Sequence, residues 1–270
     1  MISHMNHGVS EPFWVSSALI FAALVYLRGW LQLRGHEHDN VKSWRAGSFV
    51  FGLLFIWIAT ASPLATLDHE ILTAHMVQHL LLMTFAPPLI LFGTPKKLLA
   101  HSVLNPPLCW FAAAGTLVVW HIPSVFMLGL QSETWHGIEQ ASFLLTGLLF
   151  WWPVVRPWPA VSRWPESSLL LYLFLATLPC DILSGFLVFC DRVVYPVFLS
   201  SSQSFGLSAL EDQQRAGAFM WTCVTVVYLI AAAIVATRLL SPQRSEEHSI
   251  LRFESERSAA HTESQRMGAV

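Results

Sequence analysis

Seven long apolar runs dominate this 270-residue chain and decide what it can fold into. Each run has about 20 residues, the length that an α-helix needs to cross the hydrocarbon core of a bilayer. Because lipid offers no partner for unpaired backbone groups, we expect each run to be helical and the chain to form an all-α, polytopic bundle of seven transmembrane helices. The runs cover residues 13–33, 45–62, 71–93, 107–129, 136–155, 168–190 and 215–240.

The composition agrees with a chain whose surroundings are the lipid bilayer. Only 12% of its residues are charged, whereas soluble domains have about 25%. A net charge of -2 argues against nucleic acid as a partner. The four cysteines form no CxxC pair, and we predict no disulfide framework.

The basic residues predict the orientation of the bundle. Of the fifteen Lys and Arg residues, only Arg192 and Arg215 fall in segments on the side of the N-terminus, which leaves thirteen on the other side. Basic loops stay in the cytoplasm, so we expect the N-terminus outside and the C-terminus inside. Residues 1–12 are then an extracytoplasmic N-terminus without the basic start of a signal peptide, 13–240 the transmembrane domain and 241–270 a disordered cytoplasmic tail.

The third run, AHMVQHLLLMTFAPPLILFG at 74–93, carries His75 and His79. Their spacing of four residues places both imidazoles on one face of a helix. An ionisable group inside a membrane helix costs about 2.5–3.5 kcal/mol on insertion scales unless it finds a partner. The pair therefore indicates either hydrogen bonding to neighbouring helices or the ligation of a metal ion.

Other runs carry potential metal ligands at a similar depth. At 1.5 Å per residue they lie about 8–13 Å below the outer ends of their helices. Imidazole suits copper, zinc and iron, whereas thioether and thiolate groups favour Cu(I). We therefore predict a copper site of exchangeable His and Met ligands. The residues at this depth are His79, His121, Asp181, Met220 and Cys223.

Several polar residues are expected at the outer mouth of the bundle rather than inside it. His69, His136 and Glu139 are placed there by the predicted helix ends, and Asp68 and Glu70 are either solvated loop charges or groups that attract cations.

Four stretches resemble one known family in order and spacing. They are HMVQHLLLMTFAPPLILFGTP from residue 75, WHIPSVF at 120–126, HGIEQASFLLTGLLFWWP at 136–153 and LEDQQRAGAFMW at 210–221. Together they are similar to the CtaG-type cytochrome c oxidase assembly proteins, bacterial membrane proteins with seven spans. One departure is Glu139-Gln140, where the family often has Glu-His, which weakens a site at the top of the fifth span.

The resemblance implies a non-enzymatic factor that helps to mature a haem-copper oxidase in the bacterial cytoplasmic membrane, with the oxidase subunits as partners. It also carries Asp212 and Gln213 over as positions of interest, with helix capping as the alternative. Three alternatives stay open. The protein could bind haem between His121 and a facing histidine, it could transport copper or protons, or it could be an assembly scaffold that binds no metal. The predicted metal ligands are His75, His79, His121, His136, Asp181, Met220 and Cys223.

Overall fold

The computed structural model describes residues 13–36, 43–94, 105–155, 167–200 and 202–240. In these ranges all the regular secondary structure is helical. Six helical segments in these ranges are long and apolar enough to cross a membrane, or seven if one bent pair of helices counts as a span. The all-α membrane bundle is thereby confirmed. The predicted N-terminal segment 1–12 and tail 241–270 lie outside the described residues.

Five of the seven predicted spans are single helices. They are α1 (Phe13–His36), α2 (Ser43–Ala61), α8 (Glu133–Val155), α9 (Ser167–Phe189) and α10 (Ala209–Leu239). Helix α10 begins at Ala209 rather than at residue 215, because Ser208 and Glu211 form a capping box in which each side chain bonds the other's backbone N–H.

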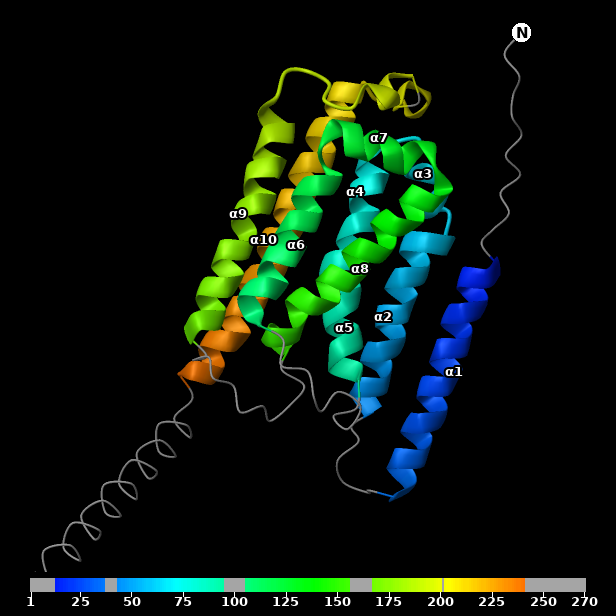
Figure 1. The fold of residues 1–270 in the computed structure, drawn as a ribbon, viewed down its shortest axis with the longest axis vertical. Coiled ribbons are helices and arrows are strands. Elements are labelled where there is room, and N and C mark those ends of the chain that lie inside the picture. Colours follow the sequence, from blue (N-terminus) through cyan, green and yellow to red (C-terminus); the bar gives the residue numbers. More distant parts are fainter. Residues whose placement is uncertain (1–12, 37–42, 95–104, 156–166, 201, 241–270) are drawn as a thin grey trace, which may run out of the picture.

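The fourth predicted span, 107–129, is wrong as a continuous helix. It divides into α6 (Pro106–Trp120) and α7 (Pro123–Gln131), whose axes differ by 78°. Pro123 lacks the backbone N–H that would continue α6, and the hydroxyl of Tyr195 donates to the carbonyl of His121 at the break, at 2.9 Å. As a result, α7 lies across the end of the bundle (Figure 1).

The third span lies in the middle of the bundle and changes its winding at a proline pair. It consists of α4 (Leu72–Leu80), a π-helical turn η1 (Leu81–Phe85) and α5 (Ala86–Gly93). Pro87 has no N–H for the carbonyl of Met83, and the indole N–H of Trp151 donates to that carbonyl instead, at 3.2 Å. The orphaned backbone acceptor is thus satisfied by a side chain of α8.

The remaining elements surround this central column (Figure 1). Helix α2 packs on α5 and α10 packs on α4, while α1 lies at one edge beside α2 and α9 at the other edge beside α10. The short helix α3 (Leu64–Leu67) and the 3₁₀ turns η3 (Pro196–Leu199) and η4 (Ser202–Phe205) lie at the same end as α7. That end is therefore closed by several short elements.

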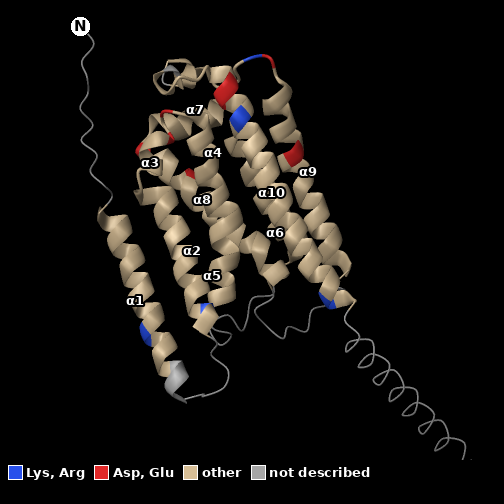
Figure 2. Ribbon diagram, turned by 180° about the vertical axis from the view of Figure 1, so that it is seen from behind, with Lys and Arg blue, Asp and Glu red and all other residues tan. Residues whose placement is uncertain are grey.

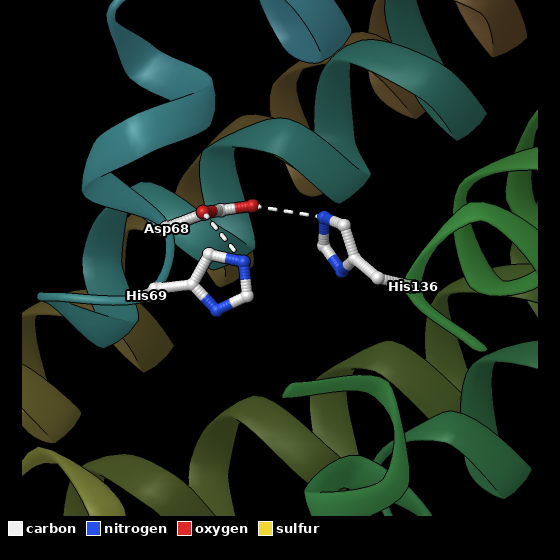
Figure 3. A group of neighbouring side chains, drawn as sticks. All are labelled: Asp68, His69 and His136. Carbon is white, nitrogen blue, oxygen red and sulfur yellow. Dashed lines mark ion pairs between the residues drawn. The ribbon is translucent and has the colours of Figure 1, made fainter. Parts of the chain in front are cut away.

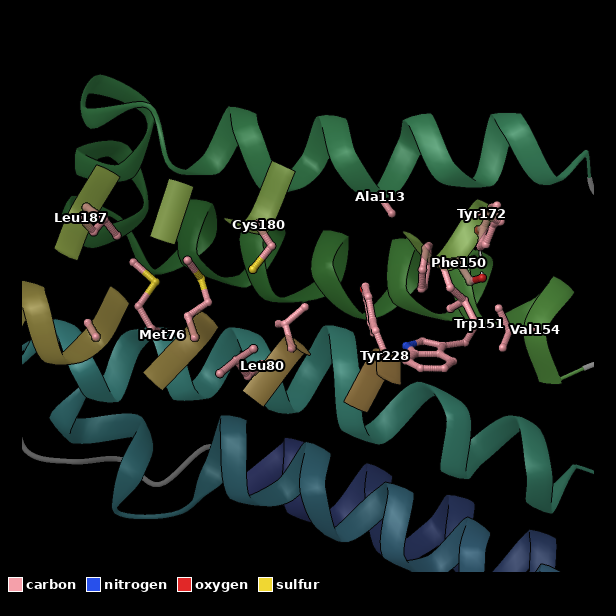
Figure 4. Close-up of a cluster of buried hydrophobic side chains, with 14 of the residues drawn as sticks. Met76, Leu80, Ala113, Phe150, Trp151, Val154, Tyr172, Cys180, Leu187 and Tyr228 are labelled. Carbon is pink, nitrogen blue, oxygen red and sulfur yellow. Dashed lines mark hydrogen bonds between the residues drawn. The ribbon is translucent and has the colours of Figure 1, made fainter. Parts of the chain in front are cut away.

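A buried apolar cluster fills the space between α4–α5, α6, α8, α9 and α10 (Figure 4). Toward one end the rings of Tyr172 and Tyr228 stack on Phe150, with centroids 5.0 and 5.4 Å away. Toward the other end the cluster contains Met76 and Cys180. Its sulfur-bearing part is the part nearest to α7.

Charge is distributed unevenly between the two ends (Figure 2). The acidic residues in the described ranges gather toward the end of α3 and α7. Arg28 lies in the last part of α1, Arg45 in the first turn of α2 and Arg238 in the last turn of α10, all at the opposite end (Figure 1). Arg192 follows α9 and Arg215 lies in the first part of α10, at the acidic end. This separation supports the predicted orientation, in which the end with α7 faces outward.

Candidate metal centre

His75 and His79 of α4 converge on one carboxylate of α8. The Nε2 atoms of His75 and His79 lie 3.5 and 3.3 Å from Oε1 of Glu139. All three side chains are buried, with exposed fractions of 0%, 5% and 0%. The two histidine rings are 4.3 Å apart, which the four-residue spacing on α4 dictates. We call these three residues the inner cluster.

Neighbouring helices fix the position of α4. The carboxylate of Asp212 on α10 accepts hydrogen bonds from the backbone N–H groups of Leu72 and Thr73 and from the Thr73 hydroxyl. An anion at a helix N-terminus satisfies free N–H groups and the helix dipole together. Farther along, the amide of Gln78 donates to the carbonyl of Ala59 on α2, at 2.7 Å. The two histidines are therefore held at a set height and rotation.

Helix α7 encloses the inner cluster. A Cβ atom at Gly129 would lie 2.6 Å from Oε2 of Glu139, so the glycine leaves the space that the carboxylate occupies. Phe126 of α7 packs on His75 and Phe143 of α8 stacks on His79, with centroids 4.7 and 4.1 Å apart. The aromatic rings keep the cluster away from water.

The inner cluster has unsatisfied polar atoms. Among the residues that the structure describes, no group makes a hydrogen bond of good geometry to the buried ring nitrogens of His75 and His79 or to the buried oxygens of Glu139. Such groups are costly unless they are paired. One ligand atom from each residue lies within 4.8 Å of the others, so a single metal ion would satisfy all three. Two imidazoles and a carboxylate fit copper, zinc or iron.

A second group of ligands lies next to the inner cluster, formed by Asp68, His69 and His136 (Figure 3). Nε2 of His136 is 3.0 Å from Asp68, and its Nδ1 is 3.4 Å from Oε2 of Glu139. Nε2 of His69 is 3.7 Å from Asp68. We call these three residues the outer cluster. Through His136 it is continuous with the inner one.

The loop residues of the outer cluster favour the forms that bind metals. Burial alone would raise the pKa of Asp68, but the hydrogen bond and charge of His136 outweigh it and hold that pKa below its usual range. Burial lowers the pKa of His69 by more than the charge of Asp68 restores. Asp68 and His69 are therefore in the states that ligate a metal ion, whereas the charge of His136 belongs to a proton that this histidine must release before it binds a metal.

His121 lies beside the inner cluster, at the break between α6 and α7. Its Nδ1 is 2.7 Å from the carbonyl of Leu117, and its Nε2 is 3.3 Å from the sulfur of Met76. Its ring centroid is 5.9 Å from that of His79. Both histidines line a cavity of about 40 Å³ together with Cys180 and Met220. Thioether and imidazole groups thus meet in this cavity.

The structure does not bring every predicted ligand to the histidines. Asp181 on α9 and Cys223 on α10 belong to neither cluster among the described residues, nor do they line the cavity. Met220 does line the cavity with His79 and His121, although the earlier start of α10 places it about 16 Å below the helix end, twice the depth expected from the sequence. Equal depths counted along separate spans therefore do not by themselves predict which residues meet.

Asp212 and Gln213 have structural roles. Asp212 caps α4, and Gln213 accepts from the N–H of Val194 and donates to the carbonyls of Leu187 and Arg192. The capping alternative given for these residues therefore agrees with their contacts.

Two ligand candidates were underestimated from the sequence. Glu139 was assigned to the mouth, and Asp68 was expected to be either a solvated loop charge or a group that attracts cations, yet neither side chain has any exposed surface. The His-x-x-Glu spacing of His136 and Glu139 was the available signal, because residues three apart share a helix face.

The bundle and its buried ligands define a multi-pass membrane protein with a potential metal-binding centre. The family described as cytochrome c oxidase caa3 assembly factor (Caa3_CtaG) matches residues 24–241, and the chain belongs to this family. No curated protein and no solved structure matches the chain.

Proposed function

We propose that this assembly factor binds copper at the inner cluster and passes it to a subunit of the oxidase on the outer side of the bacterial cytoplasmic membrane. The observation that carries the proposal is the convergence of His75, His79 and Glu139 with their buried polar atoms unsatisfied. The family supplies the destination, since a haem-copper oxidase needs copper during its assembly.

The arrangement of the donor atoms favours a single metal ion over a haem as the bound group. Both histidines approach the same carboxylate oxygen from one helix, which suits a small cation. A haem between His79 and His121 would need a slot for the porphyrin, and the adjoining cavity has only about 40 Å³. Ligand pockets for molecules of that size are about 300–1,000 Å³.

The same donor atoms also affect which oxidation state of copper the inner cluster would bind. Cu(I) was predicted on the strength of Met220 and Cys223, but the inner cluster offers nitrogen and oxygen instead of sulfur. Imidazole and carboxylate ligands accommodate Cu(II) as well as Cu(I). Binding therefore has to be measured with both ions.

Titration of the purified protein with copper, against a competing chelator, tests the proposal. We expect the wild type to bind one copper ion tightly. The affinity of Glu139→Gln for that ion should be lower by roughly tenfold or more, because a charged oxygen ligand is lost. Gly129→Ala should also weaken binding, since its Cβ would occupy the place of the carboxylate.

Gly137→Ala is the matched control, because a Cβ at that position of α8 meets nothing within 4 Å. Its affinity should equal that of the wild type. Copper binding that Glu139→Gln leaves unchanged would show that the inner cluster is not the site.

A further inference from the structure

The outer cluster differs from the inner one in its access to water. The side chain of His69 is 47% exposed and that of His136 13%, whereas Asp68 has no exposed surface. The inner residues are at most 5% exposed. An ion in water can therefore contact His69 directly, whereas the side chains of His75 and His79 are covered by protein.

Asp68 is a buried carboxylate that faces two imidazoles, and within the described part of the chain neither of its oxygens has a hydrogen bond of good geometry. The three ligand atoms of Asp68, His69 and His136 lie within 4.8 Å of one another. The residues come from the turn between α3 and α4 and from the first turn of α8 (Figure 3). Two nitrogens and one oxygen repeat the donor set of the inner cluster.

His136 connects the two clusters through its two ring nitrogens. Its Nε2 faces Asp68 and its Nδ1 faces Glu139. A neutral imidazole that binds metal through Nε2 carries its proton on Nδ1, and such ligands commonly donate that proton to a carboxylate. Glu139 is therefore placed to support an ion at the outer cluster and to ligate one at the inner cluster.

We propose that Asp68, His69 and His136 form an outer copper site, which captures the ion from water and passes it to His75, His79 and Glu139 by ligand exchange. This inference rests on the proposed function of the inner cluster. The ion loses Asp68, His69 and His136 as it gains Glu139, His75 and His79, with no change in oxidation state. Gln140, whose amide lies 2.7 Å from Nε2 of His136, turns away when the ion binds.

Rates of copper loading test the outer site. Purified wild type, Asp68→Asn and His69→Ala are mixed with copper, as Cu(I) without oxygen and as Cu(II) in separate runs, and binding is followed by the change in tryptophan fluorescence. We expect both variants to load copper at a rate lower than the wild-type rate by roughly tenfold or more. The final affinity of the inner cluster for copper should stay within about twofold of the wild-type affinity.

Glu70→Gln is the matched control for Asp68→Asn, because it removes the adjacent negative charge from an exposed side chain outside the cluster. It should load at nearly the wild-type rate. Thermal melting of each variant shows whether the fold is kept, and a variant that melts early is replaced by His69→Gln.

A second measurement isolates the outer site from the inner one. His75→Ala/His79→Ala should retain weak copper binding, and adding Asp68→Asn to it should abolish that binding. Wild-type loading rates in both single variants, or no residual binding in the double variant, would overturn the outer site alone. Failure of the wild type to bind either ion would overturn the proposed function itself.

Discussion

Replacing His75 and His79 together by alanine is expected to leave the oxidase of the cell without copper. The change removes two of the three inner ligands and leaves Glu139 buried without a partner on α4. Copper content of the purified oxidase and its activity should both fall to the values found in cells that lack this chain. The measurement is metal analysis of the oxidase from cells carrying each variant.

The control for this experiment is His248→Ala/His261→Ala, which removes two histidines from the predicted cytoplasmic tail. Cells with this variant should produce a fully copper-loaded oxidase. If the His75 and His79 variant also supports a copper-loaded oxidase, and the membrane contains normal amounts of it, the chain assists assembly as a scaffold and not as a carrier of copper.

Gly147→Ala is expected to cause a large loss of stability at the contact between α8 and the π-helical turn η1. The added Cβ would lie 2.7 Å from the carbonyl oxygen of Met83 and 2.9 Å from its Cα, and backbone atoms cannot move aside as side chains do. Overpacking of this kind costs about 1–3 kcal/mol. Thermal melting of the purified protein in detergent measures the effect.

Gly115→Ala gives the comparison, because a Cβ on that part of α6 meets nothing within 4 Å. Alanine is the better helix former by about 1 kcal/mol, so this variant should melt at the wild-type temperature or above it. Equal melting of the two alanine variants would mean that α8 and the π-helical turn η1 do not approach each other as closely as described.

The transmembrane helices can be predicted from hydropathy alone. A run of about twenty apolar residues in lipid has to be helical, because only a helix satisfies its own backbone hydrogen bonds there. The seven runs therefore predicted the bundle, and the spacing of His75 and His79 predicted two imidazoles on one face. Both are local properties that a single sequence contains.

The places where helices break or begin depend on particular side-chain contacts. The bend at Pro123 changes α7 from part of a span into a cover, and the capping box at Ser208 lengthens α10. Apolar composition is the same on either side of such points. Depths counted along ideal spans therefore differ from the depths below the helix ends that the structure gives for His121 and Met220.

Burial of Glu139 and Asp68 could not be predicted from polarity either. Other segments of the folded chain cover both side chains. Helix α7, for example, bends over Glu139 and covers it at Gly129. A polar residue near a helix end is usually solvated, and only the tertiary contacts of His136 show that both carboxylates face inward. The groups of residues that could hold a metal ion therefore include Glu139 and Asp68, which the predicted ligand set left out.

X-ray absorption at the copper edge of the copper-loaded wild type tests the inner cluster most directly. Copper held by His75, His79 and Glu139 should show a shell of nitrogen and oxygen neighbours with the scattering pattern of imidazole. A shell dominated by sulfur would instead place the ion with Met76 and Met220 beside His121, and it would contradict a copper site of two histidines and one glutamate.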